Sequence, residues 1–402
     1  MQALGELTVL ELGEGVAVAF AGKTFADFGA DVIKVESPAG DPARRWGPFA
    51  GGQPDPEASA PFLFFNRNKR GVTLDPARRS GAGLLARLAA GADLILAALS
   101  LRDLAGLGIS LSALAPERPA VVIASLTAFG EDGPYRDFRA TELTADAMGG
   151  PVSMTGQPSR APLSKPMHLV AAQVGNTLAA AALAAVVASR RAGEAQEVEV
   201  CATEVLLTSF DRRAIGLISY AVTGDTITRP FGGSRANSLP FGRYPCADGF
   251  VVLACTPRWV PRMLTTLGDA SLVEYFAAHP DAATRPQTVG VLAPVLSRWL
   301  SRHTRDECFA QATLARGWPV FPVNQPGDLL GDAHFAGRDY FPELVHPVAG
   351  RHRGPGAPWR MQDGGYQARR PAPTLGQHNA DVYGELGVDP ARLLRARALG
   401  IV

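Results

Sequence analysis

The residues with the most chemical promise near the N-terminus form a partial dinucleotide-binding pattern. Gly13-Glu14-Gly15 follows a predicted strand, and Glu36 ends the next predicted strand. In a dinucleotide site a third glycine allows close helix–strand packing, and an acidic residue binds the ribose. The third glycine is replaced by Val18 here. A partial pattern of this kind is weak evidence, so a bound nicotinamide cofactor is disfavoured.

A second pattern nearly matches a phosphate-binding loop. The segment from Ala17 to Thr24 reads A-V-A-F-A-G-K-T and places Lys23 and Thr24 as such a loop requires. However, its first glycine is replaced by Ala17, and the following residues are apolar and compatible with a helix. Phosphate is held by flexible glycine-rich backbone, so the segment predicts the first turns of an amphipathic helix instead of an ATP site.

Metal and redox chemistry have little support in the sequence. The four cysteines form no C-x-x-C pair, and the seven histidines are scattered. No H-E-x-x-H or G-x-S-x-G motif occurs. With 39 basic and 38 acidic residues the formal net charge is +1, which calls for neither nucleic acid nor an acidic membrane. The cysteines are Cys201, Cys246, Cys255 and Cys308.

The elements that would position any site alternate between strands and helices in the first part of the chain. This alternation predicts an α/β fold with a parallel sheet covered on both faces. After a polar segment that contains several glycines, the sequence pattern changes. There, Phe241 to Cys255 predicts two strands around an Ala-Asp-Gly turn. The expected strands are 7–12, 31–36, 93–97, 120–126 and 197–200, and the expected helices are 16–28, 82–90, 170–189 and 203–220.

These changes in sequence pattern predict three segments of the chain. Residues 1–225 form a large Rossmann-like domain, 226–325 a small α+β domain, and 326–402 a Pro- and Gly-rich tail with a periodic run at 381–386. The apolar stretch Val170–Ser189 is long enough to cross a membrane. Its bulk is alanine and it contains polar residues, so a buried, closely packed helix is the favoured interpretation. The N-terminus has no signal-peptide pattern, and the chain is expected in the cytoplasm.

Five segments, in order along the chain, resemble the class III CoA-transferase family, which includes formyl-, carnitine- and bile-acid CoA-transferases. Jointly they are highly specific. The resemblance implies a large Rossmann-like domain and a small domain joined by long linkers, with two chains interlocked as a dimer. The matching segments are Phe28–Pro48, Phe64–Asp75 (FFNRNKRGVTLD), Ala128–Asp137 (AFGEDGPYRD), Arg190–Val200 and Pro371–Asn379 (PAPTLGQHN).

The chemistry implied by the resemblance is transfer of CoA between carboxylates. In the family, an aspartate at the start of the Ala-rich helix attacks the donor thioester and forms a mixed anhydride. CoA then forms a thioester on that aspartate and passes to the acceptor acid, so that one difficult exchange becomes easier acyl transfers. No cofactor is bound covalently, and the CoA thioester is a co-substrate.

Two departures from the family pattern affect this chemistry. The family's spacing from Gln196, and from Gly175, places the nucleophile at Ala171, which cannot form an anhydride. The family's CoA-contacting E-N-F-R-P-G loop corresponds to Ala97–Arg102, where the Asn and Phe are lost. Weak substitutes for a catalytic group are Glu142 and His168, with Asp146 and Glu204 also near by sequence. Each is more simply explained as a structural or solvated residue.

The leading hypothesis is a non-catalytic subunit of a hetero-oligomeric class III CoA-transferase. Some two-subunit members exist, such as the succinyl-CoA-dependent benzylsuccinate enzyme. A related Asp-bearing subunit would hold the CoA thioester, and this chain would shape the acceptor pocket through Gly232, Gly233 and Ser234. Two alternatives stay open. One is a homodimeric acyl-CoA isomerase, racemase or lyase with altered catalytic residues; the other is a non-enzymatic protein that binds CoA esters or regulates.

Overall fold

The computed structural model describes residues 2–156, 159–208, 212–224 and 239–402. These residues fall into two compact units. The larger unit comprises the described residues of 1–153, 164–225 and 337–402, and the smaller unit those of 154–163 and 226–336. Gly232, Gly233 and Ser234 lie outside the described residues.

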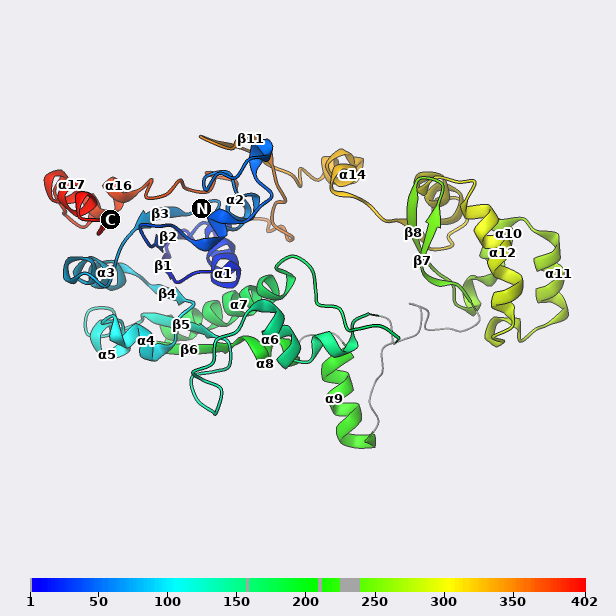
Figure 1. Cartoon of the computed structure of the whole chain (residues 1–402), viewed down its shortest axis with the longest axis horizontal. Coiled ribbons are helices and arrows are strands. Elements are labelled where there is room, and N and C mark those ends of the chain that lie inside the picture. The colour runs from blue at the N-terminus through cyan, green and yellow to red at the C-terminus, as the bar shows by residue number, and fades with distance from the viewer. Residues whose placement is uncertain (1, 157–158, 209–211, 225–238) are drawn as a thin grey trace. The chain divides into compact units, whose positions relative to one another are not determined.

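The larger unit is built on a six-stranded parallel sheet (Figure 1). The strand order is β3-β2-β1-β4-β5-β6, which is the order of dinucleotide-binding folds. The predicted mixed α/β class with a parallel sheet is therefore confirmed. The strands are β1 (Thr8–Leu12), β2 (Asp31–Glu36), β3 (Arg70–Thr73), β4 (Leu94–Ala97), β5 (Val122–Thr127) and β6 (Gln196–Cys201).

Alternating side chains of these strands pack into two separate hydrophobic cores, one on each face of the sheet. Val9 packs with helices α1 (Val16–Asp27) and α7 (Leu169–Ala192), whereas its neighbour Leu10 packs with α3 (Arg79–Gly91) and α16 (Asn379–Glu385). Successive side chains of a strand point to opposite faces, and a sheet covered on both faces needs apolar residues on each. The near-continuous apolar runs of β1 and β4 follow from this.

Helix α7 crosses the sheet in close contact with α1. A Cβ atom at Gly175 would lie 2.4 Å from the Ala17 carbonyl oxygen, so only glycine permits this approach. Among the described residues, α7 is the one helix long and apolar enough to cross a membrane. Its buried side chains, Val174, Leu178 and Ala182 among them, instead pack into the core, as predicted for a buried helix.

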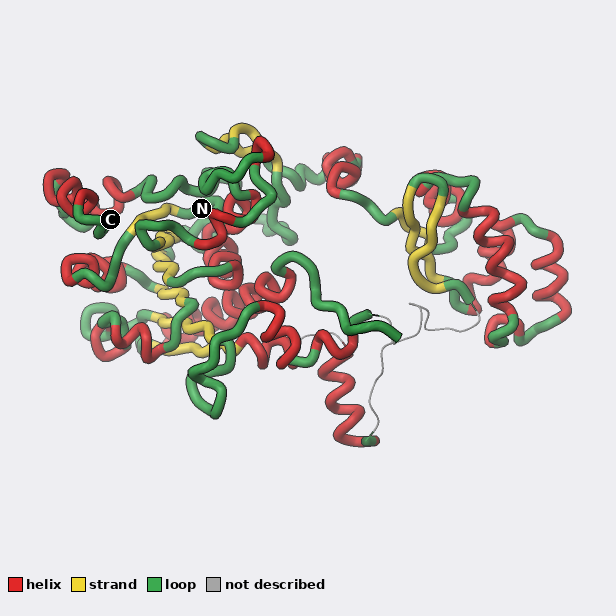
Figure 2. The backbone as a smooth tube through the Cα atoms, in the orientation of Figure 1, coloured by secondary structure: helices red, strands yellow, loops and turns green. Residues whose placement is uncertain are grey.

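The smaller unit combines a three-stranded antiparallel sheet with helices (Figure 2). The predicted pair around the Ala247-Asp248-Gly249 turn is confirmed as β7 (Phe241–Cys246) and β8 (Gly249–Ala254). A third strand, β9 (Val320–Pro322), pairs with β8 and was not expected. The helices are α10 (Val260–Leu267), α11 (Ala270–Ala278), α12 (Thr288–Leu300), α13 (Arg305–Cys308), α14 (Pro326–Gly331) and, at its boundary with the larger unit, α15 (Ala333–Gly337).

One prediction about secondary structure is corrected. Within the expected helix over 203–220 the structure describes α8 (Ala202–Thr208) and α9 (Arg212–Thr223), and residues 209–211 lie outside the described residues. The tail, expected to have few elements, contains the hairpin β10 (Glu343–His346) and β11 (Gly350–Arg353) as well as α17 (Pro390–Ala398). The remaining helices of the larger unit are α2 (Ala60–Phe65), α4 (Leu101–Gly106), α5 (Leu111–Leu114) and α6 (Glu142–Met148).

Candidate functional site

The position predicted for the nucleophile lies in the first turn of α7. Ala171 is the third residue of this 24-residue helix and is buried. The residue before the helix, His168, has φ 57° and ψ 16°, which is the left-handed conformation. The first N–H groups of a helix lack partners within the helix, and the helix dipole favours negative charge there. A carboxylate is therefore stabilised at this place.

The carboxylate found there belongs to another helix. Glu142 is the first residue of α6, whose start is fixed by reciprocal hydrogen bonds between Thr141 and Thr144. Its Oε2 accepts a hydrogen bond from the Ala171 backbone N–H at 3.3 Å. Its Oε1 lies 2.6 Å from His168 Nδ1. The structure thus brings together three of the residues that the sequence singled out: Glu142, His168 and Ala171.

An aromatic residue that the sequence analysis did not single out joins this group. The half-buried Trp46 ring stacks on the His168 ring, with centroids 4.8 Å apart and an interplanar angle of 15°. Trp46 lies within the Phe28–Pro48 segment that carries the family resemblance. No spacing rule links residues 46 and 168, so only the fold reveals the contact. The stack holds the imidazole beside Glu142.

The other two candidates are placed differently. Asp146 follows Glu142 by one turn of α6, but its side chain is buried and lies 3.7 Å from Lys165 Nζ. Glu204 belongs to α8, and across the described part of the chain no hydrogen bond or ion pair joins it to Glu142 or His168. Within the described residues, neither makes the contacts with His168 and the Ala171 N–H that Glu142 makes.

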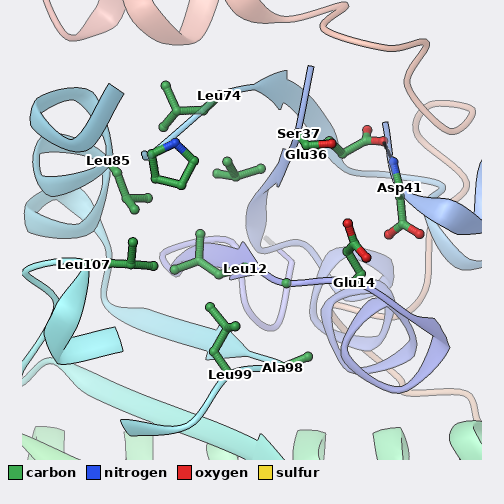
Figure 3. Close-up of a pocket in the computed structure, with 13 residues that line it drawn as sticks. Leu12, Glu14, Glu36, Ser37, Asp41, Leu74, Leu85, Ala98, Leu99 and Leu107 are labelled. Atoms are coloured by element: carbon green, nitrogen blue, oxygen red, sulfur yellow. Dashed lines mark hydrogen bonds between the residues drawn. The ribbon is translucent and has the colours of Figure 1, made fainter. Parts of the chain in front are cut away.

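A cavity of about 440 Å³ lies where β1, β2 and β4 end (Figure 3). Such positions at the carboxyl ends of parallel strands commonly hold ligands. Ala98 and Leu99 line it, and both belong to the segment predicted to replace the family's CoA-contacting loop. The lining contains three carboxylates and no lysine or arginine. Its members are Leu12, Gly13, Glu14, Val35, Glu36, Ser37, Asp41, Leu74, Pro76, Leu85, Ala98, Leu99 and Leu107.

Two of these carboxylates are held by cations behind the cavity wall. Both oxygens of Glu36 accept hydrogen bonds from the buried Arg44 guanidinium, at 2.7 and 2.8 Å. Asp41 pairs with Lys34 at 2.9 Å. The Glu36 carboxylate is therefore engaged by Arg44, which gives no added support to the dinucleotide interpretation. The third, Glu14, is exposed and lies on the same side of the cavity as Asp41 (Figure 3).

The ion pairs behind the wall continue into a buried network centred on Glu11. Lys34 and Lys69 both lie against this carboxylate, at 3.1 and 2.7 Å. Burial lowers the pKa of Lys69 to about 8, against the raising effect of Glu11. Burial also acts against the charge of Lys34, but Glu11, Asp41 and Glu36 together raise its pKa. The network fixes the wall of the cavity.

The segment resembling a phosphate-binding loop has another role. Ala17–Thr24 lies inside α1, as predicted for an amphipathic helix. Lys23 Nζ donates to Asp27 at 2.6 Å, within the same helix. The segment is therefore a regular helix, not the glycine-rich loop from which a phosphate cradle is built.

Comparison with known proteins agrees with this architecture. The model of CoA-transferase family III matches residues 4–379. The chain is 30% identical to the succinyl-CoA:(R)-benzylsuccinate CoA-transferase subunit BbsE of Thauera aromatica, over 92% of this chain and 90% of that protein. It is 28% identical to the succinate–glutarate CoA-transferase of Agrobacterium fabrum, over 95% of both chains.

A solved structure shows the same fold. The crystal structure of a CAIB/BAIF family protein from Brucella suis superimposes with a TM-score of 0.83 at 28% identity, covering 96% of this chain and 99% of that one. The match to the family model spans most of the sequence, and it includes both the parallel sheet and the helix that carries Ala171. The chain belongs to CoA-transferase family III.

Proposed function

We propose that this chain is a subunit of an enzyme that moves CoA between a CoA thioester and a carboxylic acid, and that a related Asp-bearing subunit supplies the nucleophile. The carrying observation is the methyl side chain of Ala171 at the helix terminus where the family's aspartate belongs. One relative, BbsE, is itself a subunit of a CoA-transferase. An interlocked dimer of the two subunits, each with long linkers between its domains, belongs to this proposal.

The cavity supports a division of labour in CoA binding. CoA carries several phosphate charges, and proteins bind phosphate with arginine, lysine or helix N-termini. The cavity has no basic residue in its lining, and its carboxylates are Glu14, Glu36 and Asp41. Arg44 and Lys34 neutralise the last two from behind the wall, which leaves Glu14 as the lining carboxylate that pairs with no cation in the described part of the chain. Like charges held a few ångströms apart repel by about 1 kcal/mol even in bulk water. We therefore assign the CoA thioester to the partner subunit, which leaves this chain the acceptor side, including the sequence segment Gly232-Gly233-Ser234.

Purification from the native source tests the assembly. We expect a related subunit to co-purify, and CoA transfer to require both chains. Ala171→Asp in this chain serves as the matched variant, because it restores the carboxylate without restoring the cavity. Robust CoA transfer by the unmodified chain alone, free of any second subunit, would refute the proposal.

A further inference from the structure

We propose that Glu142 is an acyl-accepting carboxylate of this chain. This inference rests on the CoA-transfer chemistry of the proposed function, and it adds one covalent step to a chain whose position 171 cannot react. The partner subunit carries the turnover of the assembly, whereas Glu142 takes up a single acyl group. The two ideas therefore have different readouts: turnover with the partner, and covalent labelling without it.

The position of Glu142 is the first argument. Its Oε2 lies 3.3 Å from the backbone nitrogen of Ala171, the residue from which the family's nucleophile would project. A carboxylate reaching from α6 therefore occupies the space next to that side-chain position. The N-terminus of α7 favours negative charge there, both on the carboxylate and on the oxyanion that forms during acyl transfer.

Orientation and access are the second argument. Reciprocal capping by Thr141 and Thr144 fixes the start of α6, and the 2.6 Å contact with His168 Nδ1 fixes the other carboxylate oxygen. The Glu142 side chain is nevertheless 36% exposed, so a substrate can reach it. Asp146, by contrast, is 1% exposed and lies near Lys165. Glu142 is the one carboxylate of α6 that is both oriented and accessible.

The reaction balances without any further reactant. A Glu142 carboxylate oxygen attacks the thioester carbonyl carbon, the C–O bond forms, the C–S bond breaks, and the thiolate leaves. The product is a mixed anhydride on Glu142. The thiolate then attacks the Glu142 carbonyl carbon, and the donor acid leaves as a carboxylate. The result is a thioester on Glu142, with the same total charge as at the start.

His168 is a positioning residue in this scheme, since it acts through Glu142. The Trp46 ring stacks on its imidazole and limits its rotation, so that Nδ1 stays 2.6 Å from the carboxylate. Removing the imidazole should therefore slow acyl uptake at Glu142 without changing how the probe binds.

The test uses the purified full-length chain with acetyl- and succinyl-pantetheine thioesters. These probes carry the thioester without the adenosine phosphates, so the acidic cavity cannot be the cause of a negative result. Hydroxylamine converts an anhydride or thioester on a glutamate into a hydroxamate, which peptide mass spectrometry locates. We expect a hydroxamate at Glu142, its loss in Glu142→Gln, and its retention in Glu197→Gln, a control on the exposed side of β6.

Two further variants make the result decisive. In Ala171→Asp we expect labelling at position 171, which shows that the probe reaches this helix terminus. In His168→Gln we expect labelling at Glu142 to slow by about tenfold at saturating probe, with the half-saturating probe concentration unchanged, because the carboxylate loses the contact that orients it. Absence of the hydroxamate at Glu142 in the unmodified chain, or equal labelling of the Glu142→Gln chain, would overturn the inference.

Discussion

The close contact between α1 and α7 predicts how the larger unit responds to one added methyl group. A Cβ atom at Gly175 would lie 2.4 Å from the Ala17 carbonyl oxygen and 2.9 Å from Phe20 Cβ. The first obstacle is backbone, so no rotamer change relieves it and the helices must move apart. Overpacking lowers the free energy of unfolding by up to about 3 kcal/mol, whereas replacing a helical glycine with alanine raises it by about 1 kcal/mol through helix propensity. We expect Gly175→Ala to destabilise the larger unit by about 2 kcal/mol.

Gly83→Ala is the matched control for this experiment. Gly83 also lies inside a helix, α3, but a Cβ atom there would meet nothing within 4 Å. We expect that substitution to stabilise by about 0.5–1 kcal/mol through helix propensity alone. Thermal unfolding midpoints, followed by circular dichroism, compare both variants with the unmodified chain. A Gly175→Ala midpoint equal to or above that of Gly83→Ala would refute the claim that this contact sets the helix spacing.

Three further predictions concern the buried charges and the cavity. Because the pKa of Lys69 is about 8 in the folded chain and 10.5 as its ordinary value, the unfolded chain binds more protons between these pH values. The contribution of Lys69 to the free energy of unfolding therefore rises with pH across that window. In urea titrations, the free energy of unfolding of the unmodified chain should rise relative to that of Lys69→Met as the pH increases. A difference that stays constant with pH would contradict this prediction. Glu36→Gln should lower the free energy of unfolding by about 3 kcal/mol, because the buried Arg44 guanidinium loses a charged partner. Glu57 contacts the same guanidinium but its side chain is 23% exposed, so Glu57→Gln should lower the free energy of unfolding by less. Glu14→Lys should strengthen CoA binding by the isolated chain several-fold at low salt, measured by calorimetry, and unchanged affinity would argue against charge as the reason for weak binding.

The elements of the parallel sheet were largely predictable from the sequence, with one instructive exception. Strands β1 and β4 are short, mostly apolar runs, and β2 alternates apolar with charged residues; local pattern identifies all three. Strand β3, Arg70–Thr73, follows a strongly basic stretch that gives no strand signal. Its neighbours Arg67 and Lys69 are buried through ion pairs with Asp27 and Glu11, far away in the chain. Burial of charge depends on distant partners, so local sequence does not reveal it.

The same distinction between local pattern and distant contacts applies to the candidate site. Ala171 was assigned to the nucleophile position through the family's spacing to Gln196 and Gly175, which the resemblance supplies. The contact between Glu142 and His168 spans 26 residues and depends on how α6 meets the start of α7. The family resemblance directs attention to the lost aspartate, and the stacked Trp46 carries no motif of its own that relates it to residue 168.

With alanine at position 171, the start of α7 is still not without a carboxylate. If alanine at position 171 had no compensating partner, we would expect the positive end of α7 to contact solvent or a neutral group. It meets Glu142, which is held on both of its oxygens by the Ala171 backbone N–H and by His168. The cavity shows the opposite outcome, because there the acidic wall has no cation to offer a phosphate. The two proposals thus divide acyl chemistry from CoA binding: Glu142 accepts a single acyl group in this chain, and the partner subunit binds CoA and carries the turnover.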